Sequence, residues 1–191
     1  MEKLKKEIRE IHIKKRKSMS FFEKEEKDKK IFKKLIDLKI FKESLFVLSY
    51  VSVNIEVDTI NLIKHCFKKK KKVFVPVCLK TIGDINFYYL NSLEQLHFST
   101  FSLLEPAPNE KNLFKNLSFK RTICVVPGFV FDVFGNRIGY GKGFYDRFLK
   151  KFDGVKIGLC YDFNLERRIL NNSFDVSVDF VLTENKIIKL I

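Results

Sequence analysis

Hydrophobic positions in this chain fall into short continuous runs that are separated by charged segments with helical periodicity. Continuous apolar runs bounded by turn residues are typical of strands that are buried on both faces of a parallel sheet. Apolar residues that recur every three or four positions within a charged segment indicate an amphipathic helix. We therefore expect strands at 45–51, 73–78, 85–90, 123–126, 155–161 and 180–182.

The helices predicted between these strands follow from periodicity and capping. Residues 1–17 form the first, with an apolar face that comprises Leu4, Ile8 and Ile11. Ser20, followed three residues later by Glu23, has the sequence of a capping box and begins a second helix that runs to about Leu38. Its core-facing residues are Ile31, Phe32, Leu35 and Ile36. Further helices are expected at 57–69, in the segment directly after the glycine-rich stretch that ends at Gly143, and at 164–170, and 93–98 is a candidate for a short one.

This alternation predicts an α/β fold. A length of 191 residues suits one domain, and no internal repeat or linker divides residues 1–191. We expect three layers, with an open, mainly parallel sheet and helices on both faces. The pattern is weakest over 91–121, where the proline-rich segment 105–108 is expected to be a loop over the site.

Composition narrows the functional classes. No apolar run is long enough to span a bilayer and no signal-peptide core follows the charged N-terminus, so a cytoplasmic protein with no membrane partner is expected. The cysteines form no CxxC pair and the histidines show no HxH or HxxxH spacing, which makes a zinc enzyme improbable. Buried free thiols are therefore predicted at Cys66, Cys78, Cys124 and Cys160.

The formal net charge of +14 invites a nucleic-acid interpretation. Residues 1–42 hold 16 Lys or Arg against 8 Asp or Glu, and residues 68–72 are five further lysines. This excess lies in predicted surface helices and a turn rather than in a stripe interleaved with aromatic residues. A solvated basic face that steers anionic small molecules is the favoured reading, with no specific nucleic-acid partner.

The stretch Val125–Lys150 carries the candidate chemistry. A buried strand breaks at Pro127-Gly128, and the chain then reaches three alternate glycines, Gly139, Gly141 and Gly143, just before a helix. Alternate glycines leave backbone N–H groups accessible to an anion, and the start of a helix favours the same ligand. The full charges nearby are Arg137, Lys142 and Arg147, and Asp146 offers oxygen ligands to a hard cation.

These residues alone leave alternatives open. The loop is not a mononucleotide P-loop, because Asn136 and Gly143 stand where that motif needs glycine and a hydroxyl residue. Glu56 follows a predicted parallel strand, where ligands bind in open α/β sheets, but it could equally lie in the first turn of a helix capped by Asp58 or Thr59. Spacing by itself favours solvated charges at Lys5 and Arg9 and does not separate a metal ligand from a turn cap at Asp175.

The motif PGxxFDxxGxRxGxGxGxYDRxL, which runs from Pro127 to Leu149, resembles the signature of the 5-formyltetrahydrofolate cyclo-ligase family. The matching positions are Pro127, Gly128, Phe131, Asp132, Gly135, Arg137, Gly139, Gly141, Gly143, Tyr145, Asp146 and Leu149. The resemblance implies a Rossmann-like fold of the NagB/RpiA/CoA-transferase type. One departure is Phe144, which stands where the family usually has tyrosine and so lacks a hydroxyl but keeps an aromatic face.

The resemblance also implies a set of site residues. Lys142, Arg137 and Arg147 are implied to be catalytic, and Asp146 and Asp175 to hold Mg²⁺. The implied ATP contacts are Lys5, Arg9, Arg137, Gly139, Tyr140, Gly141, Lys142, Gly143, Phe144 and Tyr145. The implied folate contacts are Val51, Glu56, Tyr140, Gly141, Lys142, Gly143 and Phe144.

The implied reaction is the ATP- and Mg²⁺-dependent cyclisation of 5-formyltetrahydrofolate to 5,10-methenyltetrahydrofolate, with release of ADP and phosphate. The substrate is a small molecule that can carry a polyglutamate tail, and a monomer is expected. Two rivals are a sugar-phosphate isomerase on a related scaffold, in which the loop grips phosphate without ATP hydrolysis, and a nucleic-acid-binding protein that depends on the net charge.

Overall fold

The computed structural model describes residues 2–79, 83–99, 103–115 and 120–191. Its main sheet has seven strands in the order β12-β11-β9-β6-β1-β2-β3. The inner strands β1 (Phe46–Ser49), β2 (Lys72–Leu79), β6 (Thr122–Val126), β9 (Val155–Leu159) and β11 (Phe180–Leu182) are parallel to their neighbours within this group. The edge strands β3 (Asp84–Leu90) and β12 (Ile187–Lys189) are antiparallel. The predicted open, mainly parallel sheet is confirmed.

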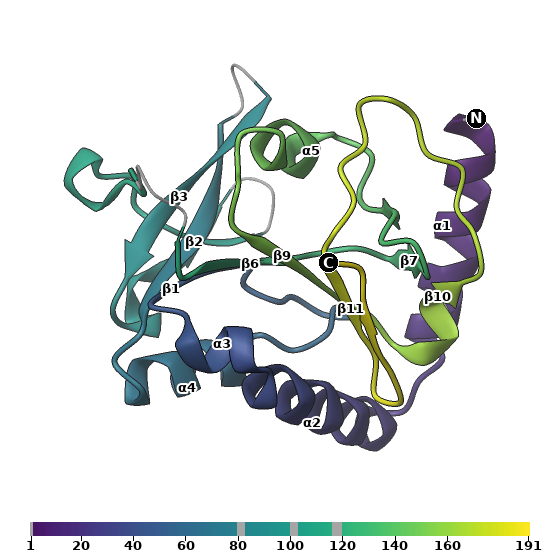
Figure 1. Cartoon of the computed structure of the whole chain (residues 1–191), viewed down its shortest axis with the longest axis horizontal. Helices are drawn as coiled ribbons and strands as arrows, with labels where there is room; N and C mark the ends of the chain where they lie inside the picture. Colours follow the sequence, from purple (N-terminus) through teal and green to yellow (C-terminus); the bar gives the residue numbers. More distant parts are fainter. Residues whose placement is uncertain (1, 80–82, 100–102, 116–119) are drawn as a thin grey trace.

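Helices cover both faces of this sheet, as predicted. Figure 1 shows α2 (Phe21–Asp37), α3 (Lys39–Glu43) and α4 (Ile60–Lys68) below the sheet and α5 (Phe144–Leu149) above it. The lower interface buries Ile31, Leu35 and Ile63 with the strands, and the upper one buries Phe87, Leu149 and Phe152. These interfaces are apolar because the strands carry hydrophobic residues on both faces.

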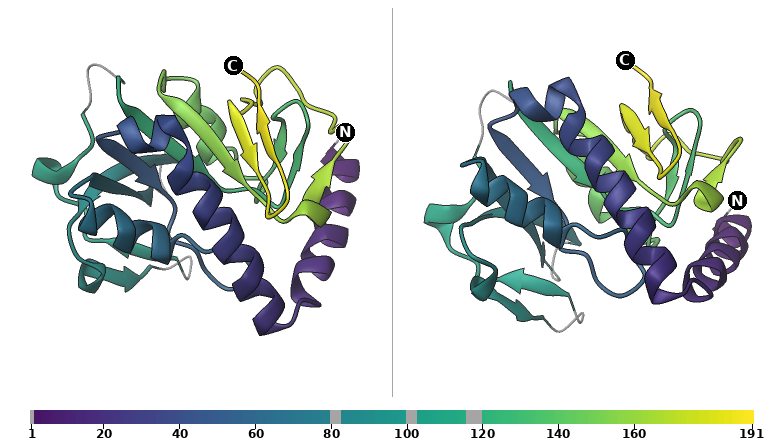
Figure 2. Two further views of the ribbon diagram at one scale, coloured as in Figure 1. Left: turned by 60° about the horizontal axis from the view of Figure 1, so that its bottom comes forward. Right: turned by 90° about the horizontal axis from the view of Figure 1, so that it is seen from below.

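Helix α1 (Glu2–Lys17) stands apart from these layers. Figure 2 shows it beside the sheet rather than across either face, and Figure 1 places it next to β7 (Val130–Asp132) and β10 (Leu165–Glu166). These two short strands form a three-stranded sheet with β8 (Arg137–Ile138). Ile8 and Ile13 pack against its small apolar cluster.

The predicted apolar face of α1 holds for Ile8, which packs against the small cluster, but is wrong for Leu4 and Ile11. Leu4 and Ile11 are exposed, whereas His12 and Arg16 are buried. The helix turns its polar side inward because the surface that receives it presents carboxylates and backbone carbonyls as well as the small apolar cluster.

Several predicted elements need correction. Residues 164–170 are not a helix but a 3₁₀ turn (Asp162–Asn164) followed by β10. In 93–98 only Leu93–Gln95 is helical, as a 3₁₀ turn, and the chain continues as β4 (Leu96–Phe98). This strand pairs with β5 (Leu104–Pro106), so the start of the proline-rich segment is a strand, and a second 3₁₀ turn follows at Glu110–Asn112.

The second helix begins as predicted, because the Ser20 hydroxyl accepts the Glu23 N–H. Helix α4 begins later than predicted, at Ile60, so Glu56 lies in the loop before it. Asp58 accepts the N–H groups of Ile60 and Asn61 and thereby caps the helix. No helix among the described residues is long and apolar enough to cross a membrane.

Candidate functional site

Loops that follow the carboxyl ends of β1 and β6 meet at one edge of the main sheet. The Tyr140 hydroxyl, in the glycine-rich loop, donates to Glu56 Oε1 at 2.8 Å. Glu56 Oε2 accepts the Val53 N–H at 3.0 Å, and the residue is only 8% exposed. Two stretches that are far apart in the sequence are thus joined by a direct hydrogen bond, at the edge where open α/β sheets bind ligands.

The Glu56 carboxyl has opposing electrostatic influences. Burial raises its pKa, because removal from water disfavours the charged form. The hydrogen bonds from Val53 and Tyr140 and the positive charge of Arg16 lower it. Burial is the largest of these influences, so the pKa of Glu56 lies above its ordinary value.

Tyr140 combines an exposed ring with an engaged hydroxyl. The residue is 54% exposed, and its ring lies edge-on to Phe129 with centroids 4.7 Å apart. Its hydroxyl is nevertheless held by the buried Glu56 carboxylate. An aromatic ring that is held by its hydroxyl and exposed to solvent can stack on a flat heterocyclic ligand.

The glycines of the loop have different reasons to be glycine. Gly141 and Gly143 have positive φ values of 82° and 67°, a conformation that L side chains rarely adopt. Gly139 has no neighbouring atom within 4 Å of where a Cβ would lie, so the folded chain does not itself require glycine there. The open space beside Gly139 fits the approach of a ligand to the backbone.

Helix α1 touches this loop through a cation. Arg9 Nε donates to the Gly139 carbonyl at 2.7 Å, and Arg9 Nη2 lies 3.0 Å from the Cβ position of Gly141. The helix also carries Lys5, whose ammonium contacts Asp175. Lys5 and Arg9 are therefore not merely solvated charges, because both make contacts across the interface between α1 and the rest of the site.

The three predicted catalytic cations are placed differently. Lys142 is exposed, and its side chain makes no polar contact with the described residues. Arg147 is exposed, lies 5.4 Å over the Phe144 ring and donates to the Lys142 carbonyl. Arg137 is 8% exposed and donates to Asp146 Oδ1 at 2.8 Å and to the Val176 carbonyl at 2.6 Å. Arg137 therefore fixes Asp146 directly.

The two predicted metal ligands are neighbours. Asp146 Oδ1 accepts the N–H of Val176, the residue that follows Asp175. Asp175 Oδ2 accepts the Lys5 ammonium at 2.5 Å and the Asn172 N–H at 2.8 Å. The second oxygen of each carboxylate has no hydrogen bond within the described part of the chain.

This arrangement fits Mg²⁺. The Lys5 ammonium already forms an ion pair with the Asp175 carboxylate, so this carboxylate binds a cation in the folded chain. Among the described residues no group of three or more His, Cys, Asp or Glu could hold a metal ion. Two carboxylates nevertheless suffice for Mg²⁺, which keeps several waters and takes its other ligands from substrate phosphates.

Comparison with known proteins decides the family. A sequence model of the 5-formyltetrahydrofolate cyclo-ligase family matches residues 1–184. The chain belongs to this family. A probable 5-formyltetrahydrofolate cyclo-ligase of Caenorhabditis elegans is 29% identical over 168 residues, which are 83% of this chain and 82% of that protein. The Escherichia coli K12 enzyme is 27% identical over 146 residues, which are 74% of this chain and 79% of that one.

Solved structures agree with this assignment. The NMR structure of Aquifex aeolicus 5,10-methenyltetrahydrofolate synthetase has a TM-score of 0.84 and 31% identity, and the match covers 98% of this chain and 93% of that one. A Mycoplasma pneumoniae synthetase, at 22% identity, supports the fold with a TM-score of 0.74 and coverage of 94% and 98%. The chain is accordingly an enzyme, a cyclo-ligase of one-carbon folate metabolism that cyclises 5-formyltetrahydrofolate.

Three further residues that the resemblance implies for the site, Val51, Phe144 and Tyr145, have mainly apolar or aromatic contacts. Val51 is buried in the core below the loop of Glu56. Phe144 lies under Arg147 at the start of α5. Tyr145 packs edge-on against Phe87, and its buried hydroxyl has no hydrogen-bond partner among the described residues.

The four cysteine thiols of the cyclo-ligase lie in surroundings that disfavour the thiolate. Burial raises the pKa of the Cys66 and Cys78 thiols to about 12, and it also raises the pKa of Cys124 and Cys160. All four are free thiols, as predicted, and three are buried, whereas Cys78 is only partly buried. A thiol with a raised pKa is a poor nucleophile at neutral pH.

Sequence reasoning missed two residues near the site, His12 and Arg16. His12 Nε2 hydrogen-bonds Glu166 Oε1 at 2.9 Å, and Arg16 donates to the Gly128 and Phe129 carbonyls. Both continue the face of α1 that Lys5 and Arg9 define, because residues 5, 9, 12 and 16 share one side of a helix. The spacing of these four residues was the signal in the sequence. It was missed because Leu4, Ile8 and Ile11 were expected to form the buried face of the helix.

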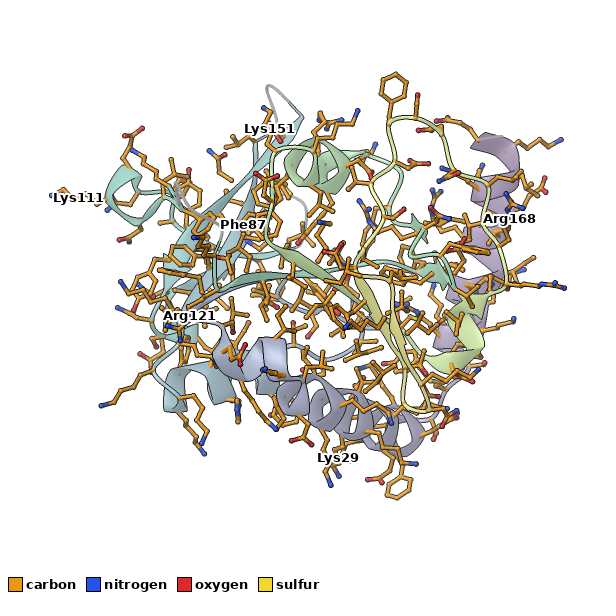
Figure 3. The ribbon with its side chains drawn as sticks, viewed as in Figure 1. Lys29, Phe87, Lys111, Arg121, Lys151 and Arg168 are labelled. Carbon is orange, nitrogen blue, oxygen red and sulfur yellow. The ribbon has the colours of Figure 1, made fainter. Side chains whose placement is uncertain are left out.

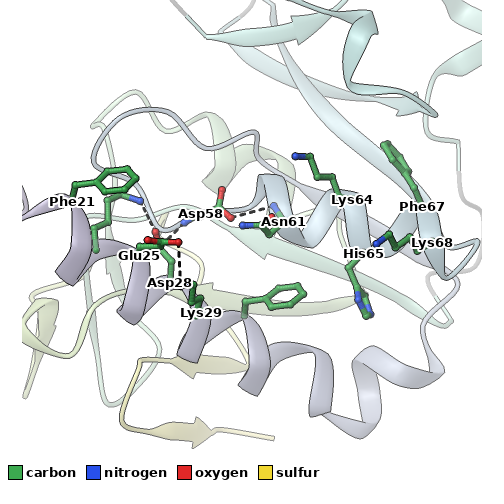
Figure 4. A pocket seen from close by; sticks show the side chains of 12 residues that line it. Phe21, Glu25, Asp28, Lys29, Asp58, Asn61, Lys64, His65, Phe67 and Lys68 are labelled. Atoms are coloured by element: carbon green, nitrogen blue, oxygen red, sulfur yellow. Dashed lines mark hydrogen bonds and ion pairs between the residues drawn. The ribbon is translucent and has the colours of Figure 1, made fainter.

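A groove of the enzyme also lies away from these residues. It measures about 840 Å³, lies between α2 and α4, and has none of the predicted site residues among its described lining residues (Figure 4). Its charges are largely paired, with Lys24 bonded to Asp28 and Lys29 bonded to Glu25. Asp28 also accepts the Tyr161 hydroxyl and the Asp58 N–H, so these contacts stabilise the helix pair.

Proposed function

We propose that this cyclo-ligase drives the cyclisation with ATP and Mg²⁺ at the edge of the sheet where the glycine-rich loop meets Glu56. The observation that carries the proposal is the Tyr140–Glu56 hydrogen bond of 2.8 Å. It puts an exposed aromatic platform and a buried carboxylate beside a loop whose backbone is open at Gly139. A folate ring and a polyphosphate can therefore lie next to one another.

The chemistry needs alignment and charge neutralisation. The formyl oxygen of the substrate attacks the γ-phosphorus of ATP, and ADP leaves with the electrons of the broken phosphoanhydride bond. N10 then closes on the activated carbon and gives up its proton to water, and the transferred phosphate leaves with the former formyl oxygen. Phosphoryl transfer of this kind depends mainly on positioned cations and in-line geometry, and it requires no covalent nucleophile from the protein.

Different residues of this chain supply the charge neutralisation and the alignment. Lys142 and Arg147 lie on the exposed side of the loop and neutralise phosphate charge. Arg9 orients the loop through the Gly139 carbonyl, and Arg137 orients Asp146. Bound Mg²⁺ would lower the repulsion between phosphate oxygens, with Asp146 and Asp175 as its protein ligands. Glu56 and Tyr140 hold the pteridine ring.

The test follows ADP release with and without 5-formyltetrahydrofolate in the wild type, Asp146→Asn and Asp153→Asn. Asp153 is an exposed carboxylate shortly after α5 and serves as the matched control. We expect folate-dependent ADP release in the wild type and the control, and a loss of about 100-fold in Asp146→Asn. ADP release that ignores the folate would contradict the coupling of the two substrates, and full activity in Asp146→Asn would contradict the metal assignment.

Other aspects stay predictions. A monomeric state, a polyglutamylated substrate and a cytoplasmic location were expected from the sequence and its resemblance. The basic surface favours an anionic substrate through electrostatic steering. Size-exclusion chromatography with light scattering measures the first, and competition between mono- and polyglutamylated folates measures the second.

A further inference from the structure

Arg16, near the end of α1, is a buried cation that has no carboxylate partner in the described part of the chain. It is 3% exposed, and no acidic oxygen among the described residues lies within ion-pair distance of its guanidinium. Buried charges are costly in free energy and are usually paired with an opposite charge. An unpaired guanidinium in this position therefore needs an explanation.

Neutral groups compensate the charge. Nη2 donates to the Gly128 carbonyl at 2.7 Å and to the Phe129 carbonyl at 3.0 Å, and Nε donates to Asn164 Oδ1 at 2.9 Å. The guanidinium carbon lies 5.3 Å from the centre of the Phe129 ring and 5.5 Å from that of Tyr161. Carbonyl dipoles and ring faces satisfy the donors but leave the positive charge uncancelled.

These contacts lead to both members of the Glu56–Tyr140 pair. Nη1 points to the Ile55 carbonyl at 3.5 Å, a long contact to the residue next to Glu56. The Phe129 ring that Arg16 covers is the ring that packs against Tyr140. One side chain therefore connects α1 to the loop after β1 and to the turn after β6.

We propose that Arg16 is a positioning residue of the folate site, which holds the Glu56 loop and the Gly128–Phe129 turn together and supplies the positive charge that faces Glu56. The inference rests on the proposed function, because it assumes that Glu56 and Tyr140 hold the pteridine ring. Arg16 itself does not touch the substrate.

The surroundings of Glu56 support the electrostatic part. The charged or titratable groups that interact with it are Arg16 from α1, Lys24 from α2, Tyr50 after β1, Tyr140 from the glycine-rich loop and Tyr145 from α5, and the Tyr161 hydroxyl contacts its backbone carbonyl. Lys24 is bonded to Asp28 at 2.6 Å, so its charge is largely neutralised. Arg16 is the cation that remains, and it lowers the pKa of Glu56 against the effect of burial.

The kinetic test compares Arg16→Gln, Arg16→Lys and Arg121→Gln. Arg121 is a matched control, because it also donates to a backbone carbonyl, that of Glu43, but it is exposed and lies on the opposite side of the molecule from α1 (Figure 3). We expect the KM for the folate to rise about tenfold in Arg16→Gln while the KM for ATP stays within about twofold. We expect both KM values, for the folate and for ATP, to be unchanged in Arg121→Gln.

A second measurement does not depend on turnover. A ¹³C NMR titration of the Glu56 carboxyl, assigned with Glu56→Gln, reports its pKa directly. Removal of the Arg16 charge disfavours the carboxylate, so we expect the Glu56 pKa to rise in Arg16→Gln and to stay near its wild-type value in Arg16→Lys. An equal rise in both KM values, or an unchanged Glu56 pKa in Arg16→Gln, would overturn the proposal.

Arg16→Lys keeps the test decisive if Arg16→Gln does not fold. Lysine retains the charge but cannot reproduce the fork that reaches Gly128, Phe129 and Ile55. We expect a rise of about threefold in the folate KM, and a wild-type folate KM would overturn the positioning role. Absence of folate turnover in the wild type would refute the proposed function instead, and the NMR titration would still decide whether Arg16 controls Glu56.

Discussion

At the scale of single residues, chemically similar side chains of the glycine-rich motif have different tasks. Asp132 is fully buried, and its two oxygens accept the N–H groups of Phe134, Asn136 and Ile169 together with the Asn136 side chain. Asp146 instead keeps one oxygen free of hydrogen bonds within the described residues. The motif could locate both carboxylates, but each also accepts a backbone N–H from a distant segment, from Ile169 for Asp132 and from Val176 for Asp146. The folded structure was therefore needed to distinguish the turn-forming carboxylate from the candidate ligand.

Lys142 is the residue on which the phosphate assignment depends most. Its side chain contacts no other described polar group, so Lys142→Ala removes no visible stabilising interaction. We expect a loss of at least about 100-fold in kcat/KM with a change in the free energy of unfolding within about 0.5 kcal/mol. Steady-state kinetics and urea unfolding measure the two quantities.

Lys151→Ala is the matched control for that variant. Lys151 is an exposed lysine just after α5, labelled in Figure 3, and we expect it to keep full activity. Near-normal turnover in Lys142→Ala, or an equal loss in both variants, would remove Lys142 from the phosphate site.

At the scale of elements, buried strands were predictable and short pairings were not. The inner strands of the sheet carry continuous apolar runs, which is why β1, β2, β6 and β9 could be located from the sequence. Strands β10 and β12 are two and three residues long and owe their conformation to distant partners, β7 and β11. A strand that forms because a distant strand pairs with it shows no hydrophobic pattern of its own in the sequence.

Helix α1 illustrates the same limit for an amphipathic pattern. Its apolar residues suggested one buried face, but its polar contacts with distant loops determine the face that packs. Lys5 bonds Asp175 and Arg9 bonds Gly139, whereas His12 and Arg16 both bond Asn164. The resemblance placed Lys5 and Arg9 at the site, whereas periodicity alone did not.

His12 makes the stability of this helix interface depend on pH. Burial lowers the pKa of His12, with a further effect from Lys15, while the bond to Glu166 opposes the change. Below pH 6.5 the unfolded chain therefore binds a proton that the folded chain resists. The contribution of His12 to stability is present above that pH and is lost as the pH falls.

We expect the free energy of unfolding to fall more steeply between pH 7 and pH 5.5 in the wild type than in His12→Gln, by up to about 1.4 kcal/mol per pH unit. Urea unfolding at several pH values measures these slopes. His97→Gln is the control, because His97 is exposed on β4 and its loss should leave the wild-type slope. Equal slopes in the wild type and His12→Gln would contradict the account.

At the scale of the whole molecule, the main sheet combines strands from both halves of the sequence. Strands β1 and β2 precede the stretch Val125–Lys150 in the sequence, β6 contains its first residues, and β9 and β11 follow it. In the main sheet these five strands are consecutive, in the order β11-β9-β6-β1-β2. We infer that the enzyme acts as one domain, since a division would separate hydrogen-bonded strands. The alternating pattern predicted this architecture because buried parallel strands and covering helices leave strong signals along the chain.

The lysine run at 68–72 was predicted to be a solvated face, and Lys71 departs from that prediction. Its ammonium donates to the carbonyls of Phe41, Lys42 and Ser44 at the end of α3, and burial lowers its pKa. Lys68, Lys69 and Lys70 are exposed.

The triple change of Lys68, Lys69 and Lys70 to Gln removes the surface charge of this run but leaves the structural contacts of Lys71 in place. We expect unchanged folate turnover and weaker nucleic-acid binding that is confined to low salt. Lys71→Gln should instead cost about 1 kcal/mol in the free energy of unfolding, because it leaves helix-end carbonyls without a donor. Loss of folate turnover in the triple variant at physiological salt would assign the run a role beyond a solvated surface.

The central claim is that this enzyme couples ATP to ring closure of 5-formyltetrahydrofolate. The most direct measurement is the growth of the methenyltetrahydrofolate absorbance band with purified protein, ATP, Mg²⁺ and the folate, and with each component omitted in turn. We predict that the band grows only in the complete mixture. Growth without ATP, or no growth although ATP and folate both bind, would contradict the account.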